Sequence, residues 1–277
     1  EMNQLRNFLD KDQKFLWWAI TGQAGAGKSR LALEFLKRST GSWFGFFIND
    51  KATQEDFDSF EPFNNTVIVI DYVAGREGFV ANAIRSIKEK FENVDYKVRI
   101  LLLERENSRN ASSWYYKLIQ RIGKYDSYDL KSTEYENYFL NLGDLDKASV
   151  EILIKEVMNQ RGIEAADTVA YELCEAYGKK YEKLQFRPLF VQIFVEAWIE
   201  NDFQLPRYDK FEELLQRLLE REQQRWLEIL DNDQVCCNAF IRLLLRANIS
   251  GKLQPDNMPS YYQDDWYIVN SFLQNHS

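Results

Sequence analysis

The sequence has few of the residues that cross-link secreted proteins or build metal centres. Its 277 residues include only three cysteines, Cys174, Cys236 and Cys237, and one histidine, His276. An odd cysteine count with two adjacent members does not make a disulfide framework, and these three lack the spacing of metal ligands. Buried thiols in a reducing cytoplasm are therefore expected. A single histidine near the end of the chain excludes catalysis by histidine and a histidine-rich metal site.

A basic excess and long apolar runs are also missing. The chain has 35 Lys and Arg against 43 Asp and Glu, a net charge of −8, which disfavours non-specific binding of nucleic acid. The longest apolar runs, such as Val67–Ile70 and Ile100–Leu103, have the length of strands and are too short to span a membrane. No basic start followed by an apolar segment marks a signal peptide. With 45% hydrophobic and 15% aromatic residues, a folded protein of the cytoplasm is expected.

What the sequence does have is a glycine-rich loop between an apolar strand and an amphipathic helix. The loop, Gly22-Gln23-Ala24-Gly25-Ala26-Gly27-Lys28-Ser29, fits the pattern G-x-x-x-x-G-K-[ST]. Its glycines let the backbone bend into a concave loop, with no Cβ between the N–H groups and a bound anion. The N-terminus of the next helix points its unpaired N–H groups and its positive dipole end at the same place. The pattern predicts a nucleotide-phosphate site, the alternative being a Gly/Ala-rich connector with a surface lysine.

Two side chains of this loop have predicted roles. Lys28 would reach the β- and γ-phosphates, and the Ser29 hydroxyl would ligate Mg²⁺. The expected cofactors are ATP or ADP with Mg²⁺, because the sequence has no Asn-Lys-x-Asp box for guanine. The nucleotide-binding residues predicted here are Gly22, Gln23, Ala24, Gly25, Ala26, Gly27, Lys28, Ser29 and Arg30.

A second candidate metal ligand ends an apolar strand. Residues 66–71 (TVIVID) combine β-branched side chains with a terminal acid, Asp71, and parallel strands buried on both faces show such runs. Ligands of open α/β sheets bind at the carboxyl ends of the strands. Asp71 is therefore predicted to hold Mg²⁺ through water, as a Walker B aspartate. The alternative is that Asp71 caps the following turn.

The position after Asp71 is unusual for a nucleotide hydrolase. Tyr72 stands where a second acid usually follows to polarise the attacking water. Glu77 and Glu104 are the possible substitutes, and the sequence does not fix the direction of either side chain. We therefore expect slow hydrolysis, or a base supplied from elsewhere.

Another interior strand ends in a charged pair. Residues 97–103 (KVRILLL) are followed by Glu104 and Arg105, which leave the sheet at the same edge as Asp71. This placement predicts that Arg105 contacts the γ-phosphate. The alternative is a solvated arginine paired with Glu104 or Glu106. The candidate catalytic residues are Lys28, Asp71 and Arg105.

Strand and helix patterns alternate over the first half of the chain and become helical after it. Apolar runs predict strands at 15–20, 43–48, 66–71, 97–103 and 138–142, an order that favours a parallel sheet flanked by helices. Residues 126–137 are predicted to be a polar loop. From Asp144 the apolar spacing is helical, with Asp146 as a predicted N-cap and Pro188 in the first turn of a later helix.

The predicted fold class is α/β, a P-loop NTPase sheet domain at 1–143, followed by an all-α, lid-like domain at 144–250. Residues 251–277 are expected to be a tail or the start of a further module. A long helix expected at 209–230 has a wide apolar face that lasts a few turns. Such a face favours core packing over a partner-binding coil.

In this order the features resemble the STAND-type P-loop ATPases, signalling relatives of AAA+ proteins that include the NB-ARC and NACHT switches. The resemblance spans about Phe15 to Trp198 and rests on Gly22–Ser29, Val67–Asp71 and the strand ending at Arg105. A strand-to-helix junction and a proline motif follow at 140–145 and 186–190. Residues 71–76 (DYVAGR) are similar to an Asp-Tyr-Ala-Glu-x-Arg pattern of bacterial members.

The resemblance implies an ATP/ADP switch that holds a sensor off, self-associates when ATP is bound, and works with fused or separate sensor and effector domains. It implies that Arg105 is the sensor arginine and that Arg187 and Pro188 lie near the nucleotide, on the helical lid. A helix cap or an ion pair is the alternative for Arg187. Two departures are that Ala74 replaces the glutamate of the bacterial pattern and that the Gly-Arg-x-x-Glu box before the first strand is absent.

Two other functions fit a phosphate-binding loop. A small-molecule kinase would need an acceptor site, which the sequence does not show, and the helical second half argues against it. A scaffold that keeps a nucleotide without hydrolysing it is consistent with Tyr72 and Ala74. The three possibilities differ in whether phosphate is released, transferred or retained.

Overall fold

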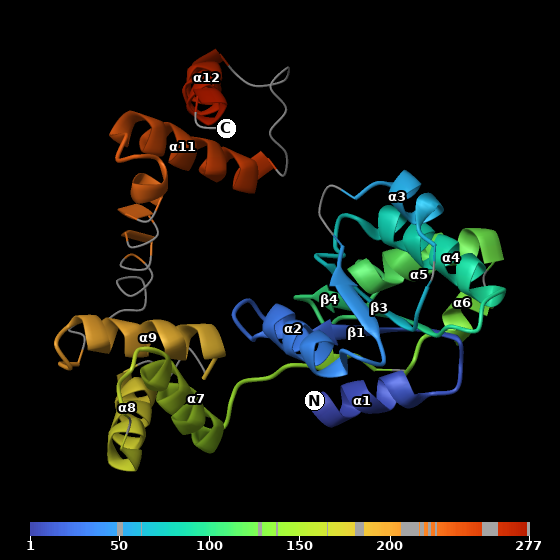
Figure 1. The fold of residues 1–277 in the computed structure, drawn as a ribbon, viewed down its shortest axis with the longest axis horizontal. Coiled ribbons are helices and arrows are strands. Elements are labelled where there is room, and N and C mark those ends of the chain that lie inside the picture. Colours follow the sequence, from blue (N-terminus) through green and yellow to red (C-terminus); the bar gives the residue numbers. More distant parts are fainter. Residues whose placement is uncertain are drawn as a thin grey trace. The chain divides into compact units, whose positions relative to one another are not determined.

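The structure is a computed structural model that describes residues 1–48, 52–61, 63–126, 129–136, 138–164, 166–180, 186–205, 216, 219–220, 223–224, 226–250 and 260–275. The chain folds into two compact units, Glu1–Val195 and Glu196–Ser277. Figure 1 shows the elements of both. The sheet and the candidate site lie in the first unit.

A parallel sheet of five strands, in the order β2-β3-β4-β1-β5, forms the centre of the first unit. Every residue of β1 and β4 is buried, as expected for strands covered on both faces. The pairing sets Thr21 opposite Glu104, and Asp71 opposite Leu103, so the carboxyl ends of three strands lie at one edge. The strands are β1 (Phe15–Thr21), β2 (Phe44–Phe47), β3 (Thr66–Asp71), β4 (Val98–Glu104) and β5 (Leu140–Asn141).

Helices cover both faces of this sheet, as the alternation along its strands requires. Trp17, Ile68 and Ile100 pack with α3, α4 and α5 on one face, whereas Trp18 and Val69 pack with α1 and α2 on the other (Figure 1). The helices of this unit are α1 (Met2–Asp10), α2 (Lys28–Ser39), α3 (Gln54–Ser59), α4 (Glu77–Glu92), α5 (Trp114–Asp126), α6 (Asp129–Ser132), α7 (Lys147–Gln160), α8 (Asp167–Lys180) and the start of α9 (Pro188–Glu200). The fold is therefore that of a P-loop NTPase sheet flanked by helices, which confirms the predicted fold class.

The prediction of a polar loop at 126–137 is wrong in part, because α6 lies within it. The residues after α6 run beside β1, where the Trp17 N–H donates to Thr133 O at 3.0 Å. The Glu134 carboxylate accepts hydrogen bonds from Tyr115 Oη at 2.6 Å and Arg109 Nη2 at 2.8 Å, and burial raises its pKa. The residues that hold this segment, Trp17, Tyr115 and Arg109, come from other elements. The polar composition of the segment itself therefore predicts a solvated loop.

Several helix ends match their sequence signals. Asp146 caps α7 by accepting the Ser149 N–H at 2.7 Å, and α9 begins at Pro188.

The three cysteines are free and buried, and burial raises the pKa of each thiol, so these thiols are poor nucleophiles.

The second unit contains α11 (Gln234–Ser250) and α12 (Ser260–Asn275). Ile268 and Phe272 of α12 pack against the buried Cys236 and Cys237, and the Arg242 guanidinium donates to Asp265 Oδ2 at 2.8 Å. Most of the long helix predicted at 209–230 falls outside the described residues. Of the helices in the described ranges, none combines the length and the apolar character that crossing a bilayer requires.

Candidate functional site

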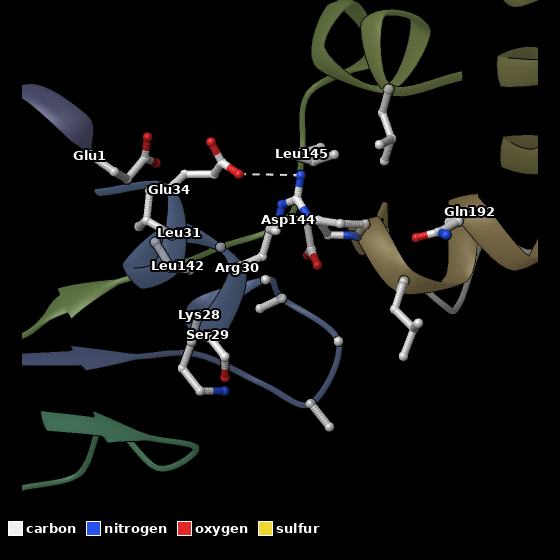
Figure 2. A pocket seen from close by; sticks show the side chains of 18 of the residues that line it. Glu1, Lys28, Ser29, Arg30, Leu31, Glu34, Leu142, Asp144, Leu145 and Gln192 are labelled. Atoms are coloured by element: carbon white, nitrogen blue, oxygen red, sulfur yellow. Dashed lines mark ion pairs between the residues drawn. The ribbon is translucent and has the colours of Figure 1, made fainter. Parts of the chain in front are cut away.

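A cavity of about 1010 Å³ lies at the carboxyl edge of the sheet. Its walls include the glycine-rich loop after β1, Asp71 at the end of β3, Glu104 at the end of β4 and residues of α7 and α9. Figure 2 shows the side chains of Lys28 and Ser29 at the start of α2, with Gln192 coming from α9. This is the edge at which ligands of open α/β sheets bind.

The loop between β1 and α2 depends on glycine at three positions. Gly22, Gly25 and Gly27 have φ angles of +154°, +80° and +91°, a backbone conformation that residues with side chains rarely adopt. A Cβ on Gly22 would lie 2.8 Å from Leu142 O, and one on Gly25 would lie 3.1 Å from the Leu189 Cβ. The sequence indicates the bend, and the structure adds that Leu142, just after β5, and Leu189 of α9 leave no room for a side chain at Gly22 and Gly25.

Gly22→Ala is expected to destabilise the first unit by about 1–3 kcal/mol, because it adds a main-chain clash to an unfavourable φ. Gly41→Ala is the matched control, since Gly41 has a φ of +100° but nothing within 4 Å of an added Cβ. Urea unfolding should show a larger loss of stability for Gly22→Ala than for Gly41→Ala. Equal losses would contradict the close approach of the loop to Leu142.

Lys28 and Ser29 lie at the start of α2 and face the end of β3. Lys28 Nζ donates to Gly22 O at 2.6 Å and to Gln23 O at 3.3 Å, so the lysine closes over its own loop. Burial lowers the pKa of Lys28, and the charge of Asp71 opposes this effect. Ser29 Oγ donates to Asp71 Oδ2 at 2.7 Å, which brings together the two predicted metal ligands.

This pair of oxygens suits magnesium. Mg²⁺ prefers oxygen ligands and usually binds through one or two carboxylates, several waters and substrate phosphates. The Ser29 hydroxyl and the Asp71 carboxylate supply part of such a set. Among the described residues no group of three or more His, Cys, Asp or Glu could hold a metal ion. The Ser29 hydroxyl and the Asp71 carboxylate fit a Mg²⁺ ion whose other ligands are water and phosphate oxygens.

The two acids predicted as possible bases are held by main-chain N–H groups. Glu104 is buried, and its carboxylate accepts from Ala74 N at 2.7 Å and from Arg105 N at 2.6 Å. Glu77 is also buried and accepts from Gly75 N at 3.1 Å. Glu104 lines the cavity, whereas Glu77 is not among its lining residues. Both carboxylates therefore fix turns at the edge of the site.

Two of the three candidate arginines, Arg105 and Arg30, line the cavity, whereas Arg187 is not among its lining residues. Arg105 lines the cavity, and its guanidinium lies 5.7 Å from the centre of the Tyr72 ring. Arg187 Nη1 lies 3.5 Å from Ala24 O, and its buried Nε has no hydrogen-bond partner in the described part of the chain. Arg30 also lines the cavity and pairs with Glu34 of the same helix at 3.3 Å, as the dashed line in Figure 2 shows.

The start of α9 touches the glycine-rich loop. Leu189 N donates to Gly25 O at 3.3 Å, and a Cβ on Gly27 would lie 3.9 Å from Pro188 Cγ. The structure thus brings Pro188 beside the loop, and its place near a bound nucleotide stays a prediction.

Sequence reasoning missed the wall of the cavity that α7 and the segment before it supply. Leu145, Leu153 and Val157 line the cavity together with Asp144 and Glu156. The helical apolar spacing marks Leu153 and Val157 as inward-facing, which was the available signal. It does not distinguish a residue that lines a cavity from one in the core.

No protein-family model matches the sequence, and no curated protein matches it either. Several solved structures resemble it in part. A Walker-type ATPase of Pyrococcus abyssi is 13% identical, with 99% of this chain and 87% of that chain covered and a TM-score of 0.46. Domain III of the Thermotoga maritima replication initiation protein DnaA is 10% identical, with 79% and 90% covered and a TM-score of 0.46. A RuvB mutant of Thermotoga maritima is 14% identical, with 72% and 60% covered and a TM-score of 0.43. Likeness of this degree does not carry an activity from one protein to another.

Proposed function

We propose that this chain binds ATP or ADP with Mg²⁺ and acts as a slowly hydrolysing nucleotide switch. The observation that carries the proposal is the 2.7 Å hydrogen bond between Ser29 and Asp71, beside a glycine-rich loop that Lys28 closes. A hydroxyl and a carboxylate at this position, next to a lysine and a helix N-terminus, suit a phosphate group and its metal ion.

Each group of the loop has a distinct part in this function. The main-chain N–H groups of Gly22–Ser29 and the Lys28 ammonium bind phosphate oxygens, and Lys28 exchanges its carbonyl partners for them. Ser29 and Asp71 hold the metal ion. Mg²⁺, when bound, neutralises charge on the phosphates. Arg105, at the edge of the same cavity, contacts the terminal phosphate.

Slow turnover is part of the proposal. Water activation needs a carboxylate within hydrogen-bond reach of the attacking water. Tyr72 stands after Asp71, where a second acid usually follows, and main-chain N–H groups hold the Glu104 and Glu77 carboxylates in fixed orientations. The isolated chain is therefore expected to release phosphate slowly.

We further propose a STAND-type signalling role in the cytoplasm. In it, residues 1–143 bind the nucleotide, residues 144–250 form a helical lid, and nucleotide state controls self-association and fused or separate sensor and effector domains. The contact of Leu189 and Arg187 with the loop supports a link between nucleotide and helices. A ligand that moves the loop would also displace the start of α9.

A non-hydrolysing scaffold that retains its nucleotide is the second candidate. It is favoured by Tyr72 and Ala74, which stand where a second acid and the glutamate of the bacterial pattern would be. Phosphate release and molecular mass, measured with ATP and Mg²⁺ and then with ADP, separate the two. Slow release with a larger mass in ATP supports the switch. Retained nucleotide with no release and no change of mass supports the scaffold, and transfer that requires an acceptor would overturn both.

Asp71→Asn is expected to remove most of the effect of Mg²⁺ on ATP affinity, about 10-fold, because the amide is a weaker ligand without charge. Titrations with Mg²⁺ and with a chelator measure this directly. Asp95→Asn is the matched control, since the Asp95 side chain is fully exposed on the surface. A metal effect of wild-type size in Asp71→Asn would contradict the assignment of Asp71 as a ligand.

A further inference from the structure

Tyr72 has a backbone conformation that a bulky side chain rarely adopts. Its φ is +55°, in the left-handed region. Its N–H donates to Asp71 Oδ1 at 2.9 Å, so the carboxylate that meets Ser29 through one oxygen holds the Tyr72 main chain through the other. Tyr72 is 55% exposed and lines the cavity. An exposed aromatic ring on a constrained backbone at this edge calls for a role in the site.

The guanidinium of Arg105 contacts the ring of Tyr72. The guanidinium lies 5.7 Å from the ring centre, within the range of a cation–π contact. Glu104 fixes the main chain next to both residues, because its two carboxylate oxygens accept hydrogen bonds from Ala74 N, after Tyr72, and from Arg105 N. The turn after β3 and the turn after β4 are thus tied together, with the tyrosine ring and the arginine side chain meeting between them.

Arg105 and Lys28 line the same cavity, Lys28 from the start of α2 and Arg105 from the turn after β4. An anion bound in this cavity can therefore meet both cations. ATP and ADP differ by one phosphate. If the side chain that contacts this phosphate is already held in place, binding ATP costs less conformational entropy, and the affinity for ATP rises relative to that for ADP.

We propose that the Tyr72 ring holds Arg105 beside the glycine-rich loop and thereby sets the preference of the site for ATP over ADP. This inference rests on the proposed nucleotide function and adds a regulatory residue to it. Tyr72 is a positioning residue, since it acts on the nucleotide through Arg105. The aromatic face is the part that matters, and the hydroxyl group is not required.

Calorimetric titration of ATP and of ADP, each with Mg²⁺, tests this in wild type, Tyr72→Phe, Tyr72→Leu, Arg105→Gln and the double variant Tyr72→Leu/Arg105→Gln. Tyr72→Phe should keep the wild-type ratio of ATP to ADP affinity. Tyr72→Leu should lower the ratio by about 2- to 5-fold, the range of an exposed cation–π contact. In the Arg105→Gln background, Tyr72→Leu should cause no further loss. Tyr171→Leu is the matched control, because Tyr171 is 56% exposed and is not among the residues that line the cavity.

The outcomes separate this inference from the function on which it rests. If wild type binds neither nucleotide, the proposed function fails and the role of Tyr72 fails with it. If wild type binds both, the role of Tyr72 alone is overturned by any of three results. These are equal affinity of wild type for ATP and ADP, a wild-type ratio in Tyr72→Leu, and an equal loss when Arg105 has already been replaced.

Discussion

Lys28→Ala is expected to weaken ATP binding by about 100-fold, because hydrogen bonds between a charged lysine and phosphate oxygens are among the stronger polar contacts in proteins. The Lys28 side chain is buried and donates to Gly22 O and Gln23 O, so it is already placed over the loop. The phosphates would replace these two carbonyl partners and offset the burial that lowers the lysine pKa. Calorimetric titration with ATP and Mg²⁺ measures the change.

Two controls keep this result specific. Lys37→Ala removes an exposed lysine from the same helix, one that pairs with Glu34 at 3.4 Å, and it should leave ATP affinity unchanged. Urea unfolding of Lys28→Ala should give a midpoint close to that of wild type, which excludes a collapse of the fold. Equal ATP affinity in Lys28→Ala and wild type would contradict a phosphate site in this loop.

Arg99→Met is expected to destabilise the first unit by about 3–4 kcal/mol, a larger loss of stability than Gly22→Ala should cause. Arg99 is fully buried in β4, and burial lowers its pKa to about 10, so it stays charged at neutral pH. Its guanidinium donates to main-chain carbonyls at and after the end of α1, so the arginine caps that helix. The hydrogen bonds reach Phe8 O at 2.7 Å, Leu9 O at 3.1 Å, Lys11 O at 2.7 Å and Gln13 O at 2.9 Å.

Methionine has similar length but no donors, so these carbonyls would lose a partner while remaining near the core. The denaturant midpoint measures the loss, and hydrogen exchange should show α1 losing protection first. Arg6→Met on the exposed side of α1 is the matched control and should change stability by less than about 0.5 kcal/mol. A loss below about 1 kcal/mol in Arg99→Met would contradict the capping role of the arginine.

The strands and most helices follow from local patterns in the sequence. The run at 66–71 predicts β3 to the residue, because β-branched side chains between polar turns leave few alternatives. Asp146 and Pro188 mark the starts of α7 and α9 through capping chemistry that acts within one turn. The segment at 129–136 could not be predicted this way, since its order depends on Trp17, Tyr115 and Arg109 from other elements.

The candidate site was predictable where a continuous motif, or the carboxyl-edge rule of parallel sheets, places its residues. The loop at 22–29 matches a motif within one continuous segment. Because ligands bind at the carboxyl ends of parallel strands, Asp71 and Arg105 were expected beside it. No local sequence pattern shows that Glu104 accepts hydrogen bonds from two main-chain N–H groups. None shows that Tyr72 has a left-handed backbone and a ring in contact with Arg105. These features arise where the turns after β3 and β4 meet, and a single-sequence pattern does not contain that information.

The central claim is that the loop at 22–29, with Asp71, holds the phosphates of an adenine nucleotide together with magnesium. Equilibrium dialysis of the intact chain against labelled ATP, with Mg²⁺ present, tests it most directly. The claim requires saturable binding of one ATP per chain with a dissociation constant well below about 1 mM, displaced by ADP and weakened by Lys28→Ala. Absence of saturable uptake up to that concentration, or uptake unchanged in Lys28→Ala, would contradict it.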